Sequence, residues 1–304
     1  MGRPTIKARH SRTYFGRGKG VVAYTLLCNH VPLQSWLSGA HEFEAHHVFD
    51  LWYRNPSDIV PTAITGDMHN INKANFAILY WFGLRFQPRF TDLDAQLKEL
   101  YCADDPTQYE HCLVRPVDQI DLQAIVDERA NIDQIIATLG LKEMIQSTLI
   151  RKLCSYTQPN PTRRAIFEFE KLVRSIYTLR YLRDPTLQRD VHRSQNRIES
   201  YHQLRAAIAQ AGGKKELTGR TDIEIEISNQ CARLMANAII YYNSALLSRL
   251  LTKCEASPNA KALALIKAIS PAAWRHIHLN GHDTFISDGT LIDLDAMVAS
   301  LDLG

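Results

Sequence analysis

The sequence predicts an α/β protein with a large helical part, and three observations lead to this class. Residues 20–90 alternate short runs of β-forming residues with helical periodicity. After Thr91 the periodicity is helical, and no strand is predicted there. The composition of the 304 residues, with 45% hydrophobic and 22% charged side chains, is that of a folded globular protein and excludes the disordered and fibrous classes.

The first 90 residues are predicted to form a strand hairpin followed by alternating helices and strands. The break at Asn29-His30-Val31-Pro32 separates two β-rich runs. Asn70 is placed to cap the second helix. The predicted elements are, in order, strands over 20–28 and 31–37, a helix over 42–53, a strand over 59–64, a helix over 71–83 and a strand over 85–90.

The rest of the chain is predicted to be helical, with breaks at prolines and glycines. Pro159 and Pro161 interrupt the first group of helices, and Gly212-Gly213 is a good stop for the long helix that precedes it. The predicted helices cover 120–139, 141–154, 165–182, 190–211 and 222–251.

The formal net charge is only +3, but the charges are segregated along the chain. Six basic residues precede the first acidic one, Glu42. Residues 92–133 carry a net charge of −8, whereas residues 151–220 carry a net charge of +9. Clustered Lys and Arg are what the neutralisation of several phosphates requires, although solvated helix faces of ordinary composition give similar blocks.

The sequence offers no sign of export or membrane insertion. No apolar run reaches the ~18 residues of a membrane span, and the N-terminus lacks the apolar stretch of a secretory signal. Six scattered cysteines in a chain of this length indicate a reducing compartment. We therefore expect a cytoplasmic protein that contacts no membrane.

Asp67 and Glu199 are the residues that the pattern favours as parts of an active site. Asp67 follows the predicted strand over 59–64, and ligands usually bind at the carboxyl ends of strands in α/β sheets. Glu199 lies on the predicted helix over 190–211, on one face with His192, Asn196 and Gln203, and Arg193 and Arg197 flank its carboxylate. A turn or capping role for Asp67 and an exposed salt bridge for Glu199 are the ordinary alternatives.

Three other groups give weaker signals. His41, His46 and His47, with Glu42 and Glu44 nearby, lack the H-E-x-x-H order of a zinc site. Cys102, His111 and Cys112 lack a paired C-x-x-C arrangement. Gly16-Arg17-Gly18-Lys19-Gly20 lacks the spacing of a phosphate loop and precedes a strand, so a turn is expected there.

Many short motifs of the chain occur, in the same order, in one family of proteins. Over nearly its whole length the sequence closely resembles the replicative transposases of class II transposons, the Tn-three family. The matching segments are Tyr14-Phe15-Gly16, Lys19-Gly20-Val21-Val22-Ala23-Tyr24-Thr25, Asn29-His30-Val31-Pro32, Gly39-Ala40-His41-Glu42, Asp67 with His69, Asn75-Phe76-Ala77-Ile78-Leu79, Phe86-x-Pro88-Arg89-Phe90, His192-Arg193-Ser194-x-Asn196-Arg197-x-Glu199-x-Tyr201-His202, Asn237-x-Ile239-Ile240-Tyr241-Tyr242-Asn243 and Ser270-Pro271-x-Ala273-Trp274-x-His276-Ile277.

The resemblance implies a ribonuclease-H-like mixed sheet that carries a catalytic triad of two Asp and one Glu. It places the second acid at Asp67 and the third at Glu199, with a large helical insertion between them. The first acid lies in the family in a Ser-Asp-Gly sequence on the first strand. No Asp or Glu precedes Glu42 here, so this strand is expected to be missing. Asp50, on a predicted helix, and Asp288, in the C-terminal tail, are poor replacements.

The same resemblance divides the chain into four parts. They are the N-terminal part of the ribonuclease-H-like core (1–90), the helical insertion (91–188), the Glu-bearing helix with the following core helix (189–250) and a C-terminal helical tail (251–304).

The activity that the resemblance implies is metal-dependent phosphoryl transfer on double-stranded DNA. Two Mg²⁺ ions about 4 Å apart, held by the three acids, activate the attacking oxygen and neutralise the leaving one. Mn²⁺ is expected to be tolerated. Water first frees a 3′-hydroxyl at each transposon end, and this hydroxyl then attacks target DNA. The residues expected to contact DNA are Lys19, Arg193, Asn196, Arg197 and His202.

With two acids of three, the chain alone is expected not to cleave or join DNA. Without the central first strand it is expected to melt at low temperature or without cooperativity. It is expected to be the C-terminal part of a transposase, from a truncated reading frame or a fragment. The alternative is a non-catalytic DNA-binding or interaction module that associates with full-length transposase. A metal-dependent nuclease unrelated to transposition is a third possibility. The family further implies a bacterial, nucleoid-associated protein that forms homo-oligomers on DNA.

Overall fold

The computed structural model describes residues 8–10, 19–39, 42, 44–66, 72–155, 158–211, 219, 221–256, 259–280 and 292–301. They belong to two compact units, which are treated separately below. The hairpin unit comprises residues 1–8, 19–37 and 196–304, and the helical unit comprises residues 9–18 and 38–195. Both are mostly helical with small sheets, so the α/β class predicted from the sequence is confirmed at that level.

The hairpin unit contains the two longest strands, β2 (Lys19–Cys28) and β3 (Val31–Gly39), which are neighbours in one sheet. Asn29 and His30 form the two-residue turn between them, and Asn29 has a φ of 56°. Asn is one of the few residues other than Gly that adopts this left-handed conformation readily, and such turns favour it. The predicted hairpin is confirmed.

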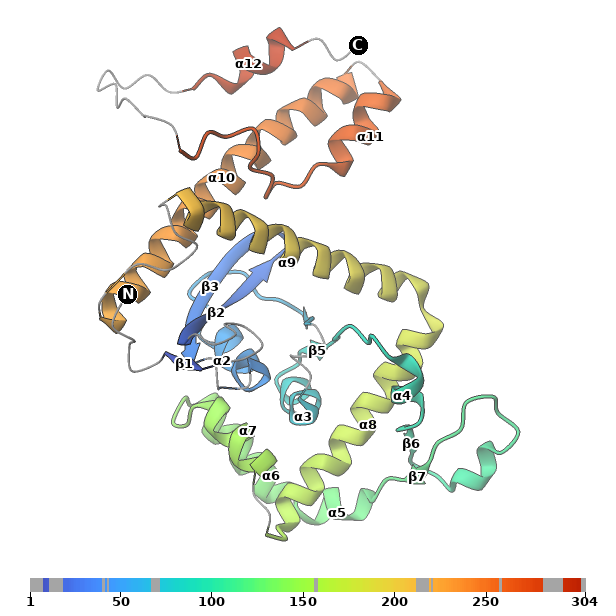
Figure 1. The fold of residues 1–304 in the computed structure, drawn as a ribbon. Coiled ribbons are helices and arrows are strands. Elements are labelled where there is room, and N and C mark those ends of the chain that lie inside the picture. The colour runs from blue at the N-terminus through green and yellow to red at the C-terminus, as the bar shows by residue number, and fades with distance from the viewer. Residues whose placement is uncertain are drawn as a thin grey trace. The chain divides into compact units, whose positions relative to one another are not determined.

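Two long helices cover this hairpin. Figure 1 shows α9 (Pro185–Ala211) running over β2 and β3, with α10 (Asp222–Ala256) beside it. Leu204 of α9 is completely buried in a cluster that includes Ala236 and Ile240 of α10, and Leu27 of β2 packs against this cluster. Burial of a Leu side chain contributes about 1.5–3 kcal/mol, so this cluster holds the helices on the hairpin.

A buried asparagine joins α10 to the segment that follows α11 (Ala260–Ala268). Asn243, which is 4% exposed, donates from Nδ2 to the backbone oxygens of Pro271 and Ala273, both at 2.7 Å. The Nε2 atom of His276 lies 2.9 Å from Oδ1 of the same side chain. Two of the motifs quoted above therefore meet in one hydrogen-bonded turn.

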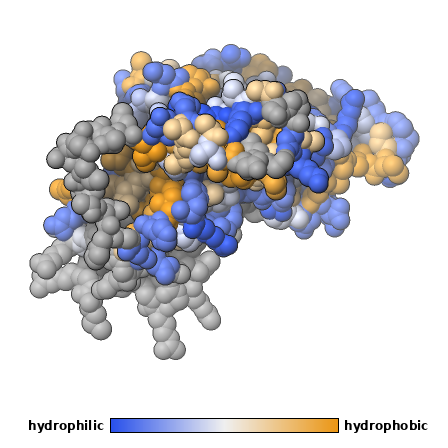
Figure 2. Space-filling model, turned by 90° about the horizontal axis from the view of Figure 1, so that it is seen from above, coloured by the Kyte–Doolittle hydropathy of each residue, from blue (hydrophilic) through white to orange (hydrophobic). Residues whose placement is uncertain are grey.

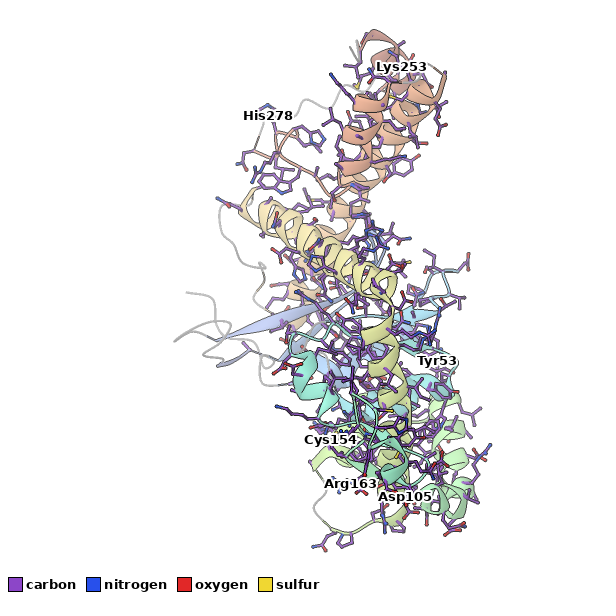
Figure 3. All side chains as sticks on the ribbon, turned by 90° about the vertical axis from the view of Figure 1, so that its right-hand side faces the viewer. Tyr53, Asp105, Cys154, Arg163, Lys253 and His278 are labelled. Atoms are coloured by element: carbon purple, nitrogen blue, oxygen red, sulfur yellow. The ribbon has the colours of Figure 1, made fainter. Side chains whose placement is uncertain are left out.

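The C-terminal helix α12 (Leu294–Ser300) is fastened to α10 by two basic side chains. Arg249 pairs with Asp295 at 2.6 Å. Lys253, labelled in Figure 3, donates to the backbone oxygens of Val298 and Leu301 at 2.8 and 2.7 Å. A positive charge at the carboxyl end of a helix also interacts favourably with the helix dipole.

The helical unit contains short strands and many helices. Its elements, in order, are β1 (Arg9–His10), η1 (Glu44–His47), α2 (Val48–Tyr53), β4 (Ala63–Ile64), α3 (Lys73–Trp81), β5 (Arg85–Phe86), α4 (Leu93–Leu97), β6 (Tyr101–Cys102), η3 (Pro106–Tyr109), β7 (Asp118–Gln119), α5 (Leu122–Asp127), α6 (Arg129–Gly140), α7 (Gln146–Ser155) and α8 (Pro161–Arg183).

The core of the helical unit forms where α3 packs on α8, as Figure 1 shows. Phe76 of α3 is fully buried, with its ring centroid 4.9 Å from that of Phe86 and 5.9 Å from that of Tyr177. At the end of α3, Trp81 stacks on Phe169 of α8 at 5.4 Å. These aromatic contacts explain why α3 forms with an almost entirely apolar sequence.

An ion-pair network is buried in the same interface. Arg174 is 3% exposed and pairs with Glu170 at 2.5 Å and with Glu99 at 3.1 Å. Burial raises the pKa of Glu170 above its ordinary value. Burial alone would also raise the pKa of Glu99, but the hydrogen bond and charge of Lys73, together with the charge of Arg174, lower it.

Several predicted elements differ from the structure. The strand predicted over 59–64 is reduced to β4 at Ala63–Ile64, because Val60 is 79% exposed and the backbone hydrogen bonds to the β5 segment begin at Thr62. The strand predicted over 85–90 is likewise only β5, which pairs parallel to β4. The cap of α3 is Asn72, whose Oδ1 accepts from the Ala74 N–H at 2.9 Å, and not Asn70.

The region after Thr91 also differs in detail. It contains one unpredicted pair of parallel strands, β6 and β7, each two residues long. The helix predicted over 120–139 is broken at Glu128 into α5 and α6. Thr162 and Asn131 donate to the Glu128 carboxylate at 2.6 and 2.7 Å, so this break is held by side chains from α8 and α6.

No helix in the part of the chain that the structure describes is long and apolar enough to cross a membrane. Figure 2 shows hydrophilic and hydrophobic residues interspersed on the face that it presents.

Candidate active site on helix α9

Glu199 lies on α9 in the hairpin unit, and its side chain is exposed. Gln203, one turn further along, donates from Nε2 to Oε1 of Glu199 at 3.2 Å. A carboxylate offers about four acceptor positions, so this single weak hydrogen bond leaves most of them open. An exposed salt bridge is the ordinary alternative role for Glu199. Among the described residues, however, its hydrogen-bond partner is the neutral amide of Gln203.

The spacing of residues along α9 fixes the direction of Glu199. Tyr201 and Leu204 are 3% and 0% exposed and belong to the core cluster, whereas Asn196, Glu199 and His202 are exposed. Residues three apart on a helix share a face. The same periodicity that buries one side of α9 therefore presents the three polar residues to solvent together.

A polar network beneath α9 holds its rotation and its register. Arg205 donates to the backbone oxygen and to Oδ1 of Asn229 on α10, at 3.1 and 2.9 Å. Asn229 is fully buried and donates from Nδ2 to the Ser35 hydroxyl of β3 at 3.1 Å. Burial lowers the pKa of Arg205 below its ordinary value. The network joins α9, α10 and the hairpin through one asparagine.

Arg197 contacts the tip of the hairpin. Its Nη1 atom donates to Oδ1 of Asn29 at 3.1 Å. Burial, followed by the charge of Arg197, lowers the pKa of the adjacent His30. His30 therefore stays neutral around pH 7, and the positive charge at the hairpin tip is that of the guanidinium.

The other basic and polar residues predicted to contact DNA have varied surroundings. Arg193, one turn before Arg197 on α9, is exposed and lies 3.6 Å from the Asp190 carboxylate, a surface pair that contributes little to stability. The ring of His202 lies 6.4 Å from that of Tyr201. Lys19 begins β2, but its side chain lies outside the described residues.

Asp67 lies outside the residues that the structure describes, as do residues 68–71. The described chain before it contains β4 and ends at Gly66, whose backbone oxygen accepts from the Arg89 N–H at 2.9 Å. The position of Asp67 after a short parallel strand is thus consistent with the sequence pattern. Its role as the second acid stays a prediction.

Asp50 is occupied by a structural role. Its carboxylate accepts from the backbone N–H groups of Gln146 and Ser147, at 3.0 and 2.9 Å, and so caps the first turn of α7. A carboxylate at a helix N-terminus satisfies otherwise unpaired donors and interacts favourably with the dipole. These contacts account for Asp50 without any catalytic role.

The described members of the weaker metal-binding patterns do not form a cluster. Among the described residues, no group of three or more His, Cys, Asp or Glu side chains is arranged to hold a metal ion. His47 instead lies 2.8 Å from the Glu42 carboxylate, and Cys102 donates to the backbone oxygen of Asp104 at 3.0 Å. His41 lies outside the described residues.

The exposed carboxylate of Glu199 suits a hard divalent cation such as Mg²⁺, which prefers oxygen ligands and keeps several of its waters. Glu199 supplies one such ligand in the described part of the chain. Sequence reasoning missed Asn29, Arg205 and Asn229 as supports of this site. For Asn29 a signal existed, since an Asn in a two-residue turn often adopts positive φ, but nothing in the sequence pairs it with Arg197.

The sequence of the chain matches one family model and several curated proteins. The family model described as Tn3 transposase DDE domain matches residues 1–282. The transposase for transposon Tn1546 of Enterococcus faecium is 25% identical over 279 residues, which are 90% of this chain and 28% of that protein. The transposase for transposon Tn2501 of Escherichia coli is 27% identical over 246 residues, 78% of this chain and 24% of that protein.

The transposase for transposon gamma-delta of Escherichia coli K12 is 23% identical over 288 residues, 92% of this chain and 28% of that protein. The chain thus spans 24% to 28% of the length of these curated relatives. No solved structure matches it.

Proposed function

Because the chain belongs to the family of Tn3 transposase DDE domains, we propose that it serves DNA transposition as the part of a transposase that holds the phosphoryl-transfer site. The observation that carries this proposal is the match over residues 1–282, which contains both Asp67 and Glu199. The exposed, largely unpaired carboxylate of Glu199 on a well-anchored helix is what such a site requires.

The proposed fold is the ribonuclease-H-like one. In this proposal residues 1–90 form part of its core, residues 91–188 the helical insertion, residues 189–250 the Glu-bearing and following helices, and residues 251–304 the tail. The described strands on which this proposal rests are the hairpin of β2 and β3 and the parallel pair of β4 and β5, which lie in separate sheets. In this proposal the strand with the first catalytic Asp is not among these 304 residues, since no acid precedes Glu42.

Asp67 and Glu199 are proposed to hold divalent cations, Mg²⁺ or Mn²⁺. Such ions activate an attacking oxygen and neutralise a leaving one at a phosphodiester. In this proposal Asn196 and His202, which share the exposed side of α9 with Glu199, position the scissile strand. Arg193, Arg197 and Lys19 bind backbone phosphates of the duplex.

We further propose that the 304 residues alone neither cleave nor join DNA. Two of the three carboxylates would not hold both cations in the geometry that the reaction needs. The test is a strand-transfer assay with the chain, DNA carrying the ends of the transposon that encodes it, and Mg²⁺ or Mn²⁺. No joined product is expected. Robust joining would overturn the proposal that the site is incomplete.

A second function is favoured by one observation, the absence of any acid among the first 41 residues, which contain six basic ones. On this alternative the chain binds DNA and associates with full-length transposase without catalysing a reaction. Binding would then be sensitive to salt and indifferent to Mg²⁺. Glu199→Gln would leave binding and association unchanged, and a loss of metal-dependent binding in this variant would contradict the alternative.

A further inference from the structure

The tip of the β2–β3 hairpin carries an asparagine that is placed to hold a basic side chain. Asn29 is exposed, has a φ of 56° and accepts from Nη1 of Arg197 at 3.1 Å. We propose that Asn29 is a positioning residue that orients the Arg197 guanidinium for contact with a DNA phosphate. This inference rests on the proposed function, in which Arg197 binds the DNA backbone.

The hydrogen bond is poorly explained as a device for stability. An exposed hydrogen bond contributes little to the free energy of unfolding, because water replaces it at small cost. The turn itself does not need the amide either, since glycine adopts positive φ with less strain than asparagine. The asparagine side chain therefore does something that a glycine turn does not do.

What the amide does is fix the direction of a long, flexible cation. A guanidinium has five N–H donors in a rigid plane, and one contact with Asn29 leaves the others available for phosphate oxygens. Arg197 is half-buried against the hairpin, so its stem is also restrained. The Arg197 side chain is therefore already ordered before DNA binds. Because less conformational entropy is lost on binding, the affinity for DNA is higher.

The position of Arg197 on α9 indicates which phosphate it serves. Residues two apart leave a helix in nearly opposite directions, so Arg197 and Glu199 do not reach the same phosphate. A helix is about 10 Å wide, and a DNA strand advances about 3.4 Å per nucleotide. Arg197 is therefore suited to a phosphate roughly three nucleotides from the one at Glu199.

The amide is also the right choice of acceptor. A carboxylate at position 29 would hold the guanidinium more firmly, but it would neutralise the charge that attracts phosphate. His30 adds no second positive charge at pH 7, because burial and the charge of Arg197 lower its pKa. The neutral oxygen of Asn29 thus orients the cation without cancelling it.

The test measures binding of the 304-residue chain to a 30-base-pair duplex of mixed sequence without metal, over a range of salt concentrations. Asn29→Gly is expected to weaken binding about three- to tenfold with the salt dependence unchanged, because Arg197 still reaches phosphate. Asn29→Asp and Arg197→Gln are expected to weaken binding and to reduce the slope of log K against log salt by about 1. Asn280→Gly, at an exposed position elsewhere in the hairpin unit, is the matched control and is expected to bind normally.

The outcomes separate this inference from the proposed function. If Arg197→Gln weakens binding and Asn29→Gly does not, the positioning role of Asn29 is overturned and the DNA-binding role of Arg197 stands. If Arg197→Gln binds as the unaltered chain does, or if the unaltered chain does not bind DNA, the positioning role of Asn29 and the DNA-binding role of Arg197 are both overturned.

A second readout needs no DNA. NMR titration of His30 is expected to give a higher pKa in both Asn29→Gly and Arg197→Gln, because the cation is no longer held nearby. An unchanged pKa in Asn29→Gly, alongside a raised one in Arg197→Gln, would show that Asn29 does not hold Arg197 in solution.

Discussion

Arg205 of α9 donates two hydrogen bonds to one residue of α10, Asn229, at 3.1 Å to the backbone oxygen and 2.9 Å to Oδ1. Asn229 in turn donates a hydrogen bond from Nδ2 to the Ser35 hydroxyl of β3 at 3.1 Å. The helix that carries Glu199 is therefore fixed to both neighbours by directional contacts, in addition to the apolar cluster around Leu204. The rotation of α9, and with it the direction of the carboxylate, follows from these contacts.

Asn229→Ala is expected to lower the free energy of unfolding by about 1–3 kcal/mol, because Arg205 and Ser35 lose their buried partner. Chemical denaturation of the two proteins measures the difference. Gln203→Ala, which removes only an exposed amide on α9, is the control and is expected to change stability by less than about 0.5 kcal/mol. Equal effects of the two substitutions would show that the buried network does not hold the helices together.

Asp50→Ala is expected to lower the free energy of unfolding by about 1 kcal/mol, the usual effect of removing a helix cap. Asp50→Asn retains acceptor oxygen and is expected to recover part of the loss. Thermal melting followed by circular dichroism distinguishes the variants. An increase in stability for Asp50→Asn, as expected when a repulsive catalytic carboxylate is removed, would argue against the capping role.

Phe76→Ala is expected to lower the free energy of unfolding by about 3–5 kcal/mol, since its ring fills the fully buried interface between α3 and α8. Tyr80→Ala removes a ring on the same helix that is 56% exposed and is expected to have a much smaller effect. Denaturant titration of both variants gives the comparison. Similar losses would mean that α3 is not buried as the structure has it.

Acidification is expected to destabilise the fold as the pH falls below about 6.5. Burial and the charge of Arg197 lower the pKa of His30, and burial followed by the charges of His47 and Arg151 lowers the pKa of His46. The unfolded chain therefore binds more protons than the folded one in this window, so a fall in pH favours unfolding.

Denaturation at pH 7.5 and pH 5.5 measures this effect. The double variant His30→Gln/His46→Gln is expected to lose less stability between the two pH values than the unaltered chain. An identical loss in both proteins would contradict the origin assigned to it.

The sequence predicted most of the hairpin unit because its signals are local. Alternation of β-forming residues, a two-residue turn at Asn29 and helical periodicity up to Ala211 each arise within a few residues. The strand predicted over 59–64 was too long because strand formation depends on a neighbouring strand, which a local signal does not reveal. An apolar run forms a strand only where a neighbour pairs with it, and here pairing is limited to Ala63 and Ile64.

The site was predictable in its residue types but not in its supports. Glu199 stands out on a basic helix, and the resemblance of its surroundings to one family identified it. The contacts that orient α9 connect residues 24 to 194 positions apart, as between Arg205 and Asn229 or between Asn229 and Ser35. No short-range pattern carries that information. Even a local prediction missed by two residues, since the cap of α3 is Asn72 and not Asn70.

The central claim is that Asp67 and Glu199 are two acids of a phosphoryl-transfer site. Its most direct test joins the chain, at its N-terminus, to a segment with the family's Ser-Asp-Gly strand and measures strand transfer in Mg²⁺ on DNA with the matching transposon ends. The joined protein is expected to form product, and Asp67→Asn or Glu199→Gln is expected to reduce the rate about a thousandfold or more, in line with the several kcal/mol that bound metal contributes to such reactions. Product formation by the joined Glu199→Gln protein at an undiminished rate would contradict the claim.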